Sequence, residues 1–147
     1  MRLTPRQEIV LAALAADPGA SFEPVQVQKL FFLLDENIAN ALGGKQFKFK
    51  PYDFGPFDKD VYKELEILES KGLVWINTDS QENSRRQYTL TFNGQGKGNE
   101  ELASLDPGVQ QYVKELSSWV RRLSFAQLVG SIYNAYPHMR KNSIFQG

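Results

Sequence analysis

Apolar residues recur at helical spacing in five stretches of the chain, and each stretch begins with a helix-start signal. In the first stretch, Thr4 and Pro5 supply the capping residue and the first-turn proline. Glycines follow the last apolar positions of the first three stretches, as is common after a helix. The pattern predicts helices over about 4–16, 24–42, 58–71, 106–123 and 124–136.

A short alternating segment and a ring-rich segment lie between the second and third predicted helices. Residues 45–50 alternate with period two, which predicts a short, half-buried strand ended by Pro51. Gly55 and Pro56 then interrupt residues 52–57, where aromatic and proline rings crowd together. Because glycine followed by proline disfavours regular structure, we expect an irregular turn there.

Two apolar segments after the third predicted helix indicate a β-hairpin. Residues 73–76 and 85–90 are typical of strands, and the polar residues 77–84 are typical of the loop between them. Three helices followed by a hairpin is the order of a winged-helix domain, in which the hairpin loop is the wing. The sequence therefore predicts a mainly helical α+β fold: a winged-helix-like core with a small β-hairpin and two added C-terminal helices.

The length of 147 residues suits one domain. We expect a single domain over residues 1–147, with its core at about 24–92 and a helical extension at about 106–136. The glycine-rich residues 94–98 match neither common phosphate-binding pattern. The dinucleotide fingerprint requires glycine where Asn99 stands, and the phosphate-binding loop requires serine or threonine where Gly98 stands. This run is predicted to be a flexible connection.

Composition excludes several kinds of chemistry. The chain has no cysteine and one histidine, so disulfides, thiol nucleophiles and zinc sites lack their residues. The histidine, His138, lies in a post-helical turn and is expected to be a surface or packing residue. Asp53, Asp58 and Asp60 lie close together in sequence as magnesium ligands do, but Asp58 and Asp60 fit a helix cap and a first-turn acid better. We expect no metal, no cofactor and no enzymatic activity.

The charge balance and the hydropathy bear on location. Lysine plus arginine and aspartate plus glutamate number 17 each, so no bulk field attracts nucleic acid or anionic lipid. No apolar run approaches the ~20 residues of a membrane span, and residues 1–7 carry no signal-peptide pattern. The sequence predicts a cytoplasmic protein without membrane contact.

Two kinds of binding site stay open on the residues alone. A DNA-binding winged helix would use its third helix and wing, where the candidates are Lys59, Lys63, Arg85 and Arg86. However, residues 58–71 hold five acids and three lysines, a net charge of −2 that would repel phosphate. A protein-binding site would instead use the ring-rich segment, since exposed aromatic rings are common anchors. Burial of most of those rings is the competing interpretation. The rings are Phe47, Phe49, Tyr52, Phe54 and Phe57.

Several motifs together resemble the Panacea domain, the SocA-like antitoxin family. These are the Lys-Leu-aromatic helix at 27–34, the Gly-Pro turn at 52–57, the Val-Tyr helix that follows it, and Gly72-Leu73-Val74. The resemblance covers residues 27–74, about a third of the chain. It implies a domain without catalytic activity that neutralises a toxin by binding it directly, in some cases delivering it to a protease. The family positions matched here are Lys29, Leu30, Tyr52, Gly55, Pro56, Val61 and Tyr62.

The sequence thus leads us to expect an antitoxin-like module that binds a partner protein, with a DNA-binding regulator as the alternative. The expected partner-binding residues are Lys29, Phe47, Phe49, Tyr52, Asp53, Phe54, Gly55, Pro56 and Tyr62.

Overall fold

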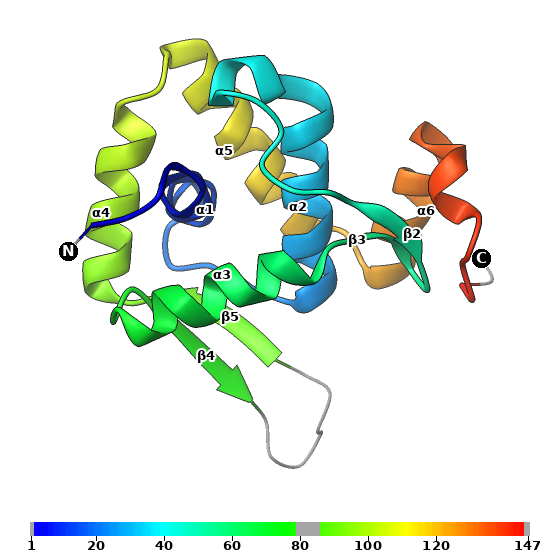
Figure 1. Ribbon diagram of the computed structural model, residues 1–147, viewed down its shortest axis with the longest axis horizontal. Coiled ribbons are helices and arrows are strands. Elements are labelled where there is room, and N and C mark those ends of the chain that lie inside the picture. The colour runs from blue at the N-terminus through cyan, green and yellow to red at the C-terminus, as the bar shows by residue number, and fades with distance from the viewer. Residues whose placement is uncertain (1, 79–85, 146–147) are drawn as a thin grey trace.

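The computed structural model describes residues 2–78 and 86–145 of the chain, and it is 62% helical (Figure 1). The helices are α1 (Pro5–Ala15), α2 (Pro24–Ile38), α3 (Lys59–Ser70), α4 (Phe92–Ala103), α5 (Pro107–Arg122) and α6 (Phe125–Ala135), with short 3-10 turns η1 (Ala39–Leu42) and η2 (Pro137–Arg140). The strands are β1 (Ser21–Phe22), β2 (Lys50–Tyr52), β3 (Gly55–Phe57), β4 (Val74–Thr78) and β5 (Arg86–Leu90).

The predicted winged-helix layout is confirmed. Strands β1, β5 and β4 form one antiparallel sheet in that order, with Thr89 of β5 paired to Ser21 on one side and Trp75 on the other. The β4–β5 hairpin extends away from the helical body beside α3 (Figure 1). Residues 79–85, which include most of the predicted wing loop, lie outside the described part of the chain.

The predicted helix starts are confirmed where the capping signal was strongest. The side chains of Thr4 and Ser124 each accept a hydrogen bond from the backbone N–H of a glutamine three residues on, and that glutamine side chain accepts one in return. Asp58 accepts a hydrogen bond from the backbone N–H of Asp60 at 2.9 Å and so caps α3. Gly72 ends that helix with a φ of 75°.

Helix α1 lies in the middle of the molecule and is almost wholly buried from Val10 to Ala15 (Figure 1). Its closest partner is α4, where the prediction of a flexible glycine-rich connection is wrong. A Cβ at Gly98 would lie 2.5 Å from the Cβ of Ala15 and 2.6 Å from the carbonyl oxygen of Leu11. Gly98 therefore allows α1 and α4 to pack at short distance, and this gain outweighs the low helix propensity of glycine.

The predicted helices α5 and α6 follow the core as expected, but α4 precedes them as a further helix. None of the described helices combines the length and the hydropathy that a membrane crossing requires.

The strand predicted over residues 45–50 is wrong for most of its length, because Asp35 binds the backbone of this segment. The carboxylate of Asp35 accepts hydrogen bonds from the N–H groups of Gln46 at 2.9 Å and Phe47 at 3.0 Å. Those donors are then not available to a neighbouring strand. Regular pairing begins only at Lys50.

The irregular turn predicted over residues 52–57 is also wrong: this segment completes a hairpin. Strands β2 and β3 pair antiparallel with Pro51 opposite Pro56 and Tyr52 opposite Gly55. Alternate pairs of an antiparallel ladder exchange no backbone hydrogen bonds, and facing prolines suit such a position. Gly55 has a φ of 99°, a left-handed conformation that other residues rarely adopt.

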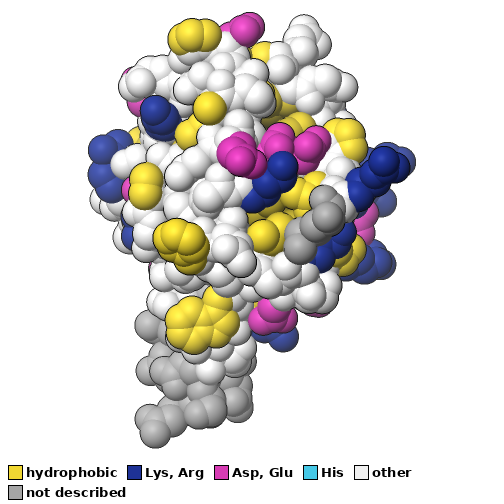
Figure 2. Space-filling view, turned by 90° about the vertical axis from the view of Figure 1, so that its left-hand side faces the viewer, with side chains coloured by type: hydrophobic (Ala, Val, Ile, Leu, Met, Phe, Trp, Pro, Cys, Tyr) yellow, Lys and Arg dark blue, Asp and Glu magenta, His cyan; other side chains and the backbone are white. Residues whose placement is uncertain are grey.

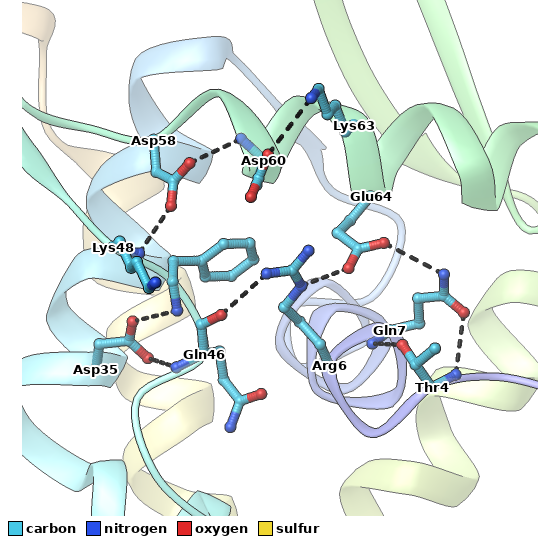
Figure 3. A network of polar contacts seen from close by, with 11 residues as sticks. Thr4, Arg6, Gln7, Asp35, Gln46, Lys48, Asp58, Asp60, Lys63 and Glu64 are labelled. Atoms are coloured by element: carbon cyan, nitrogen blue, oxygen red, sulfur yellow. Dashed lines mark hydrogen bonds and ion pairs between the residues drawn. The ribbon is translucent and has the colours of Figure 1, made fainter.

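Polar side chains join α1, α3 and the segment before β2 (Figure 3). Arg6 of α1 forms an ion pair with Glu64 of α3 and donates through Nη1 to the carbonyl oxygen of Gln46 at 3.1 Å. Its guanidinium lies 4.8 Å from the ring centre of Phe47. Gln7 donates through Nε2 to Glu64 at 3.2 Å. This network fixes α3 against α1 on the side opposite its exposed face.

Candidate functional site

Exposed cationic side chains gather around the N-terminal half of α3. Lys59 and Lys63 lie one turn apart on the helix, and Lys48 and Lys50 come from the segment that leads into β2. Lys48, Lys50 and Lys59 line one groove of about 400 Å³ at the start of the helix, together with Asp58 and Asp60. Because the N-terminus of a helix also carries a partial positive charge, cations and helix dipole add at this end.

The acidic residues of α3 offset these cations less than the sequence count suggests. Glu64 is 5% exposed and its charge is balanced by the ion pair with Arg6. Asp58 serves as the helix cap, and an Oδ of Asp60 lies 3.8 Å from the Nζ of Lys63. The net charge of −2 therefore overstates the negative charge that a ligand approaching the helix would meet.

The far half of α3 is different in character. Glu66 and Glu69 are exposed there, and Ile67 is 41% exposed. Glu69 accepts a hydrogen bond from the backbone N–H of Ile76 in β4 at 3.3 Å. The positive surface is therefore confined to the first two turns of the helix and the residues beside them.

Arg86 extends this surface from the helix to the β4–β5 hairpin. It is exposed at the start of β5 and lies close enough to Tyr62 to favour the ionised phenol. Burial is the stronger effect and raises the pKa of Tyr62 to about 12. Tyr62 in turn stacks on Tyr88 of β5 at 6.2 Å between ring centres, which joins helix and strand. Arg85, the other predicted wing arginine, lies outside the described residues.

The residues predicted to bind a partner protein do not form one exposed patch. Phe47 is 5% exposed and lies in the core, where the centre of its ring is 5.8 Å from the ring centre of Phe31. Phe49 is half-buried and packs edge-to-face on Phe32, with 5.5 Å between the ring centres. Tyr52 and Phe54 are 53% and 39% exposed, so the ring-rich segment is divided between core and surface. Of the remaining candidates, Gly55 and Pro56 are buried, and Asp53, Phe57 and Tyr62 are half-buried.

Lys29 is the least expected of these placements. It is 3% exposed on α2, and its Nζ donates a hydrogen bond to the carbonyl oxygen of Pro56 at 3.1 Å. Burial lowers the pKa of Lys29 to about 7. Lys29 directly precedes the continuous apolar run at residues 30–34, which was a signal of burial in the sequence. No signal in the sequence indicated its contact with the Gly-Pro turn.

The structure also describes the lone histidine and the acidic residues considered as metal ligands. His138 is exposed in η2 beside the ring of Tyr136, at 6.3 Å. Within the described ranges 2–78 and 86–145, no three His, Asp or Glu side chains group as a metal site would require.

A different surface lies between α1, α4 and α5. It holds an apolar hollow of about 200 Å³, whose lining includes Ile9, Leu34 and Leu105 and the acids Glu8 and Glu101. Figure 2, which views the molecule from the α4 side, shows apolar and acidic side chains together on this face. The positive groove and the apolar hollow are therefore separate features.

Comparison with known proteins returns little. No protein-family model matches the chain, and no curated protein matches it. The resemblance to the Panacea domain therefore stays a prediction, as does the absence of enzymatic activity. Among solved structures, a crystal structure of a MepR mutant from a multidrug resistant S. aureus clinical isolate is similar, with 20% sequence identity and a TM-score of 0.41. The match covers 94% of this chain and 78% of that chain.

This finding corrects the main function expected from the sequence. The antitoxin that the sequence led us to expect does not appear among these comparisons: the similar structure is of MepR, a winged-helix transcriptional regulator, and no comparison supports a toxin partner. A likeness at this TM-score and identity says nothing about what the chain binds. The charges and contacts around α3 bear on that question.

Proposed function

We propose that this protein binds double-stranded DNA as a winged-helix regulator, with the first two turns of α3 and the β4–β5 hairpin as the contact surface. The observation that carries the proposal is the gathering of exposed cations at one end of α3. These residues are Lys48, Lys50, Lys59, Lys63 and Arg86. The proposal includes no reaction and no cofactor.

The arrangement suits a duplex in two ways. The major groove of DNA admits an α-helix, and the exposed face of α3 carries Lys59 and Lys63 at the end that a phosphate backbone would meet. Lys48 and Lys50 flank this end, and Arg86 on the hairpin lies near Tyr62 of α3. Contacts from helix, preceding segment and wing would therefore reach one stretch of DNA backbone from three elements.

Most of these contacts would be to phosphate, so we expect strong salt dependence and modest sequence preference. The exposed residues between Lys59 and Glu69 are Lys63, Glu66 and Ile67, and of these only the lysine and the glutamate can hydrogen-bond to base edges. Sequence selection would then come from Lys63, Glu66 and the shape of the duplex.

Titration of the full chain against fluorescent duplexes tests the proposal. The probes are random-sequence DNA and the DNA upstream of the protein's own gene, each measured by anisotropy at several salt concentrations. Replacing both Lys59 and Lys63 with alanine should weaken binding at least tenfold. It should also reduce the slope of log K against log salt concentration by about 2, because each lost phosphate contact reduces that slope by about 1. Lys114→Ala on α5 removes an exposed cation elsewhere and serves as the control.

Two results would overturn the proposal. The first is no binding of either duplex at about 50 mM salt, where phosphate contacts are strongest. The second is a loss in the Lys114→Ala control as large as the loss in the α3 double variant. Thermal unfolding of each variant shows that the fold is retained.

A further inference from the structure

A small cleft lies between the first turns of α2 and the β2–β3 hairpin, away from the cationic groove. Its volume is about 210 Å³, which is below the size of sites that hold drug-sized molecules. Aromatic rings form one side, and the start of α2 forms the other. The apolar and aromatic wall residues are Pro24, Val25, Tyr52, Phe54, Phe57 and Tyr62.

The cationic group at this cleft is the ammonium of Lys29, and the polar side chains of Gln28 and the half-buried Asp53 line the cleft beside it. One of its three N–H donors is used by the carbonyl oxygen of Pro56 at 3.1 Å. Among the described residues, no carboxylate lies within ion-pair distance of it, and burial is the only cause that lowers its pKa. A buried cation without a counter-ion is unfavourable unless something else compensates it.

Gly55 keeps the space beside this ammonium open. A Cβ at Gly55 would lie 3.6 Å from both Cε and Nζ of Lys29 and 3.4 Å from Cε1 of Tyr133. The hydroxyl of Tyr133 is itself buried and has no hydrogen-bond partner in the part of the chain that the structure describes. Lys29 and the ring of Tyr133 thus both lie beside Gly55, and neither side chain has a complete set of hydrogen-bond partners among the described residues, which is unusual in a folded protein.

We propose that the cleft binds a small monocarboxylate with a flat apolar body. The carboxylate would accept charge-assisted hydrogen bonds from the free donors of Lys29 and so supply the missing counter-ion. The apolar body would lie between Val25 and the aromatic rings, whose faces suit a planar ligand. The size of the cleft limits the ligand to about the dimensions of one six-membered ring with its carboxylate.

The charge and the shape of the ligand can be tested separately with three probes. Benzoate has both the carboxylate and the flat body, benzamide has the same shape without the charge, and acetate has the charge without the body. Calorimetric titration of the full chain at pH 6.5, where the ammonium form predominates, should give saturable one-to-one binding of benzoate. For so small a ligand we expect a dissociation constant of roughly 0.1–1 mM, with benzamide and acetate at least tenfold weaker.

Two variants identify the site. Lys29→Met removes the ammonium and should weaken benzoate binding at least tenfold, whereas Lys114→Met on α5 should leave it unchanged. Val25→Phe keeps the ammonium but fills the cleft from the wall, so it should also abolish binding. Circular dichroism and the thermal midpoint report whether each variant is folded. If Lys29→Met does not fold, Val25→Phe and the three probes still test whether the cleft binds the ligand.

Several results would overturn the proposal. Equal binding of benzoate and benzamide would show that no cation is involved. Unchanged binding in a folded Lys29→Met or Val25→Phe variant would place the ligand elsewhere. No saturable benzoate binding by the natural chain up to about 10 mM would exclude a site of this kind. None of these measurements involves DNA, so they are independent of the proposed DNA binding.

Discussion

Gln28 of α2 and Asp58 at the start of α3 exchange two hydrogen bonds. The Nε2 of Gln28 donates to the carbonyl oxygen of Asp58, and the backbone N–H of Asp58 donates to the Oε1 of Gln28, both at 3.0 Å. One buried amide thus satisfies both backbone groups of the residue that caps α3. This side chain therefore helps to hold the proposed DNA-binding helix in register with α2.

Replacing Gln28 with leucine should lower the free energy of unfolding by about 2–4 kcal/mol. Leucine keeps the volume, but it leaves the N–H and the carbonyl oxygen of Asp58 without partners, and each unsatisfied group costs about 1–3 kcal/mol. Urea unfolding followed by circular dichroism measures the change. Gln111→Leu on the exposed face of α5 is the matched control and should change stability by less than about 0.5 kcal/mol. Equal effects at the two positions would contradict the role given to Gln28.

The glycines of α4 should respond in opposite directions to alanine. At Gly98 a Cβ would lie 2.5 Å from Ala15 and 2.6 Å from Leu11, so Gly98→Ala should force α1 and α4 apart and destabilise by about 2 kcal/mol or more. At Gly96 on the same helix a Cβ meets nothing within 4 Å. Gly96→Ala should therefore stabilise the protein by up to about 1 kcal/mol through helix propensity. Thermal unfolding of the two variants measures both effects, and a loss at Gly96 would contradict this explanation.

Helix α4 illustrates why part of the fold could not be predicted from the sequence. Helix caps such as Thr4 with Gln7 are local, so the pattern alone predicted them correctly, and the order of helices and hairpin gave the winged-helix fold. The helix α4 contains three glycines within residues 94–98, and its stability depends on packing against α1, which no local pattern reports. The prediction of a flexible connection failed for that reason.

The candidate sites depended on contacts between distant segments in the same way. Lys59 and Lys63 could be chosen from the sequence, but the partner that balances Glu64 is Arg6, which lies far away along the chain. The strand expected over residues 45–50 was lost to Asp35, whose carboxylate comes from a different element. Long-range polar contacts of this kind leave little trace in the spacing of residues.

The buried Lys29 should make the stability of the protein depend on pH above neutrality. Its pKa is about 7 in the folded chain and 10.5 when exposed, so the unfolded chain binds more protons at pH values between these two. Stability must then rise with pH across this interval, by about 2 kcal/mol from pH 7 to pH 9. Urea unfolding at a series of pH values measures the rise.

Matched variants assign this pH dependence to one residue. Lys29→Met carries no titrating group and should show a nearly flat profile between pH 7 and pH 9, whereas Lys114→Met should keep the rise of the natural chain. A rise that persists in Lys29→Met would mean that another group is responsible.

Asp35 should be among the most sensitive polar positions, because its carboxylate replaces the strand partner that residues 46 and 47 lack. Asp35→Ala leaves the buried N–H of Phe47 and that of Gln46 unsatisfied, at a cost of about 2–4 kcal/mol. Asp35→Asn keeps one acceptor oxygen and removes a charge whose burial already raises the pKa of this carboxyl. It should therefore cost about half as much, and unfolding of the two variants by urea measures the difference. If asparagine were as damaging as alanine, the charge of Asp35 and not its two acceptor oxygens would hold the segment before β2.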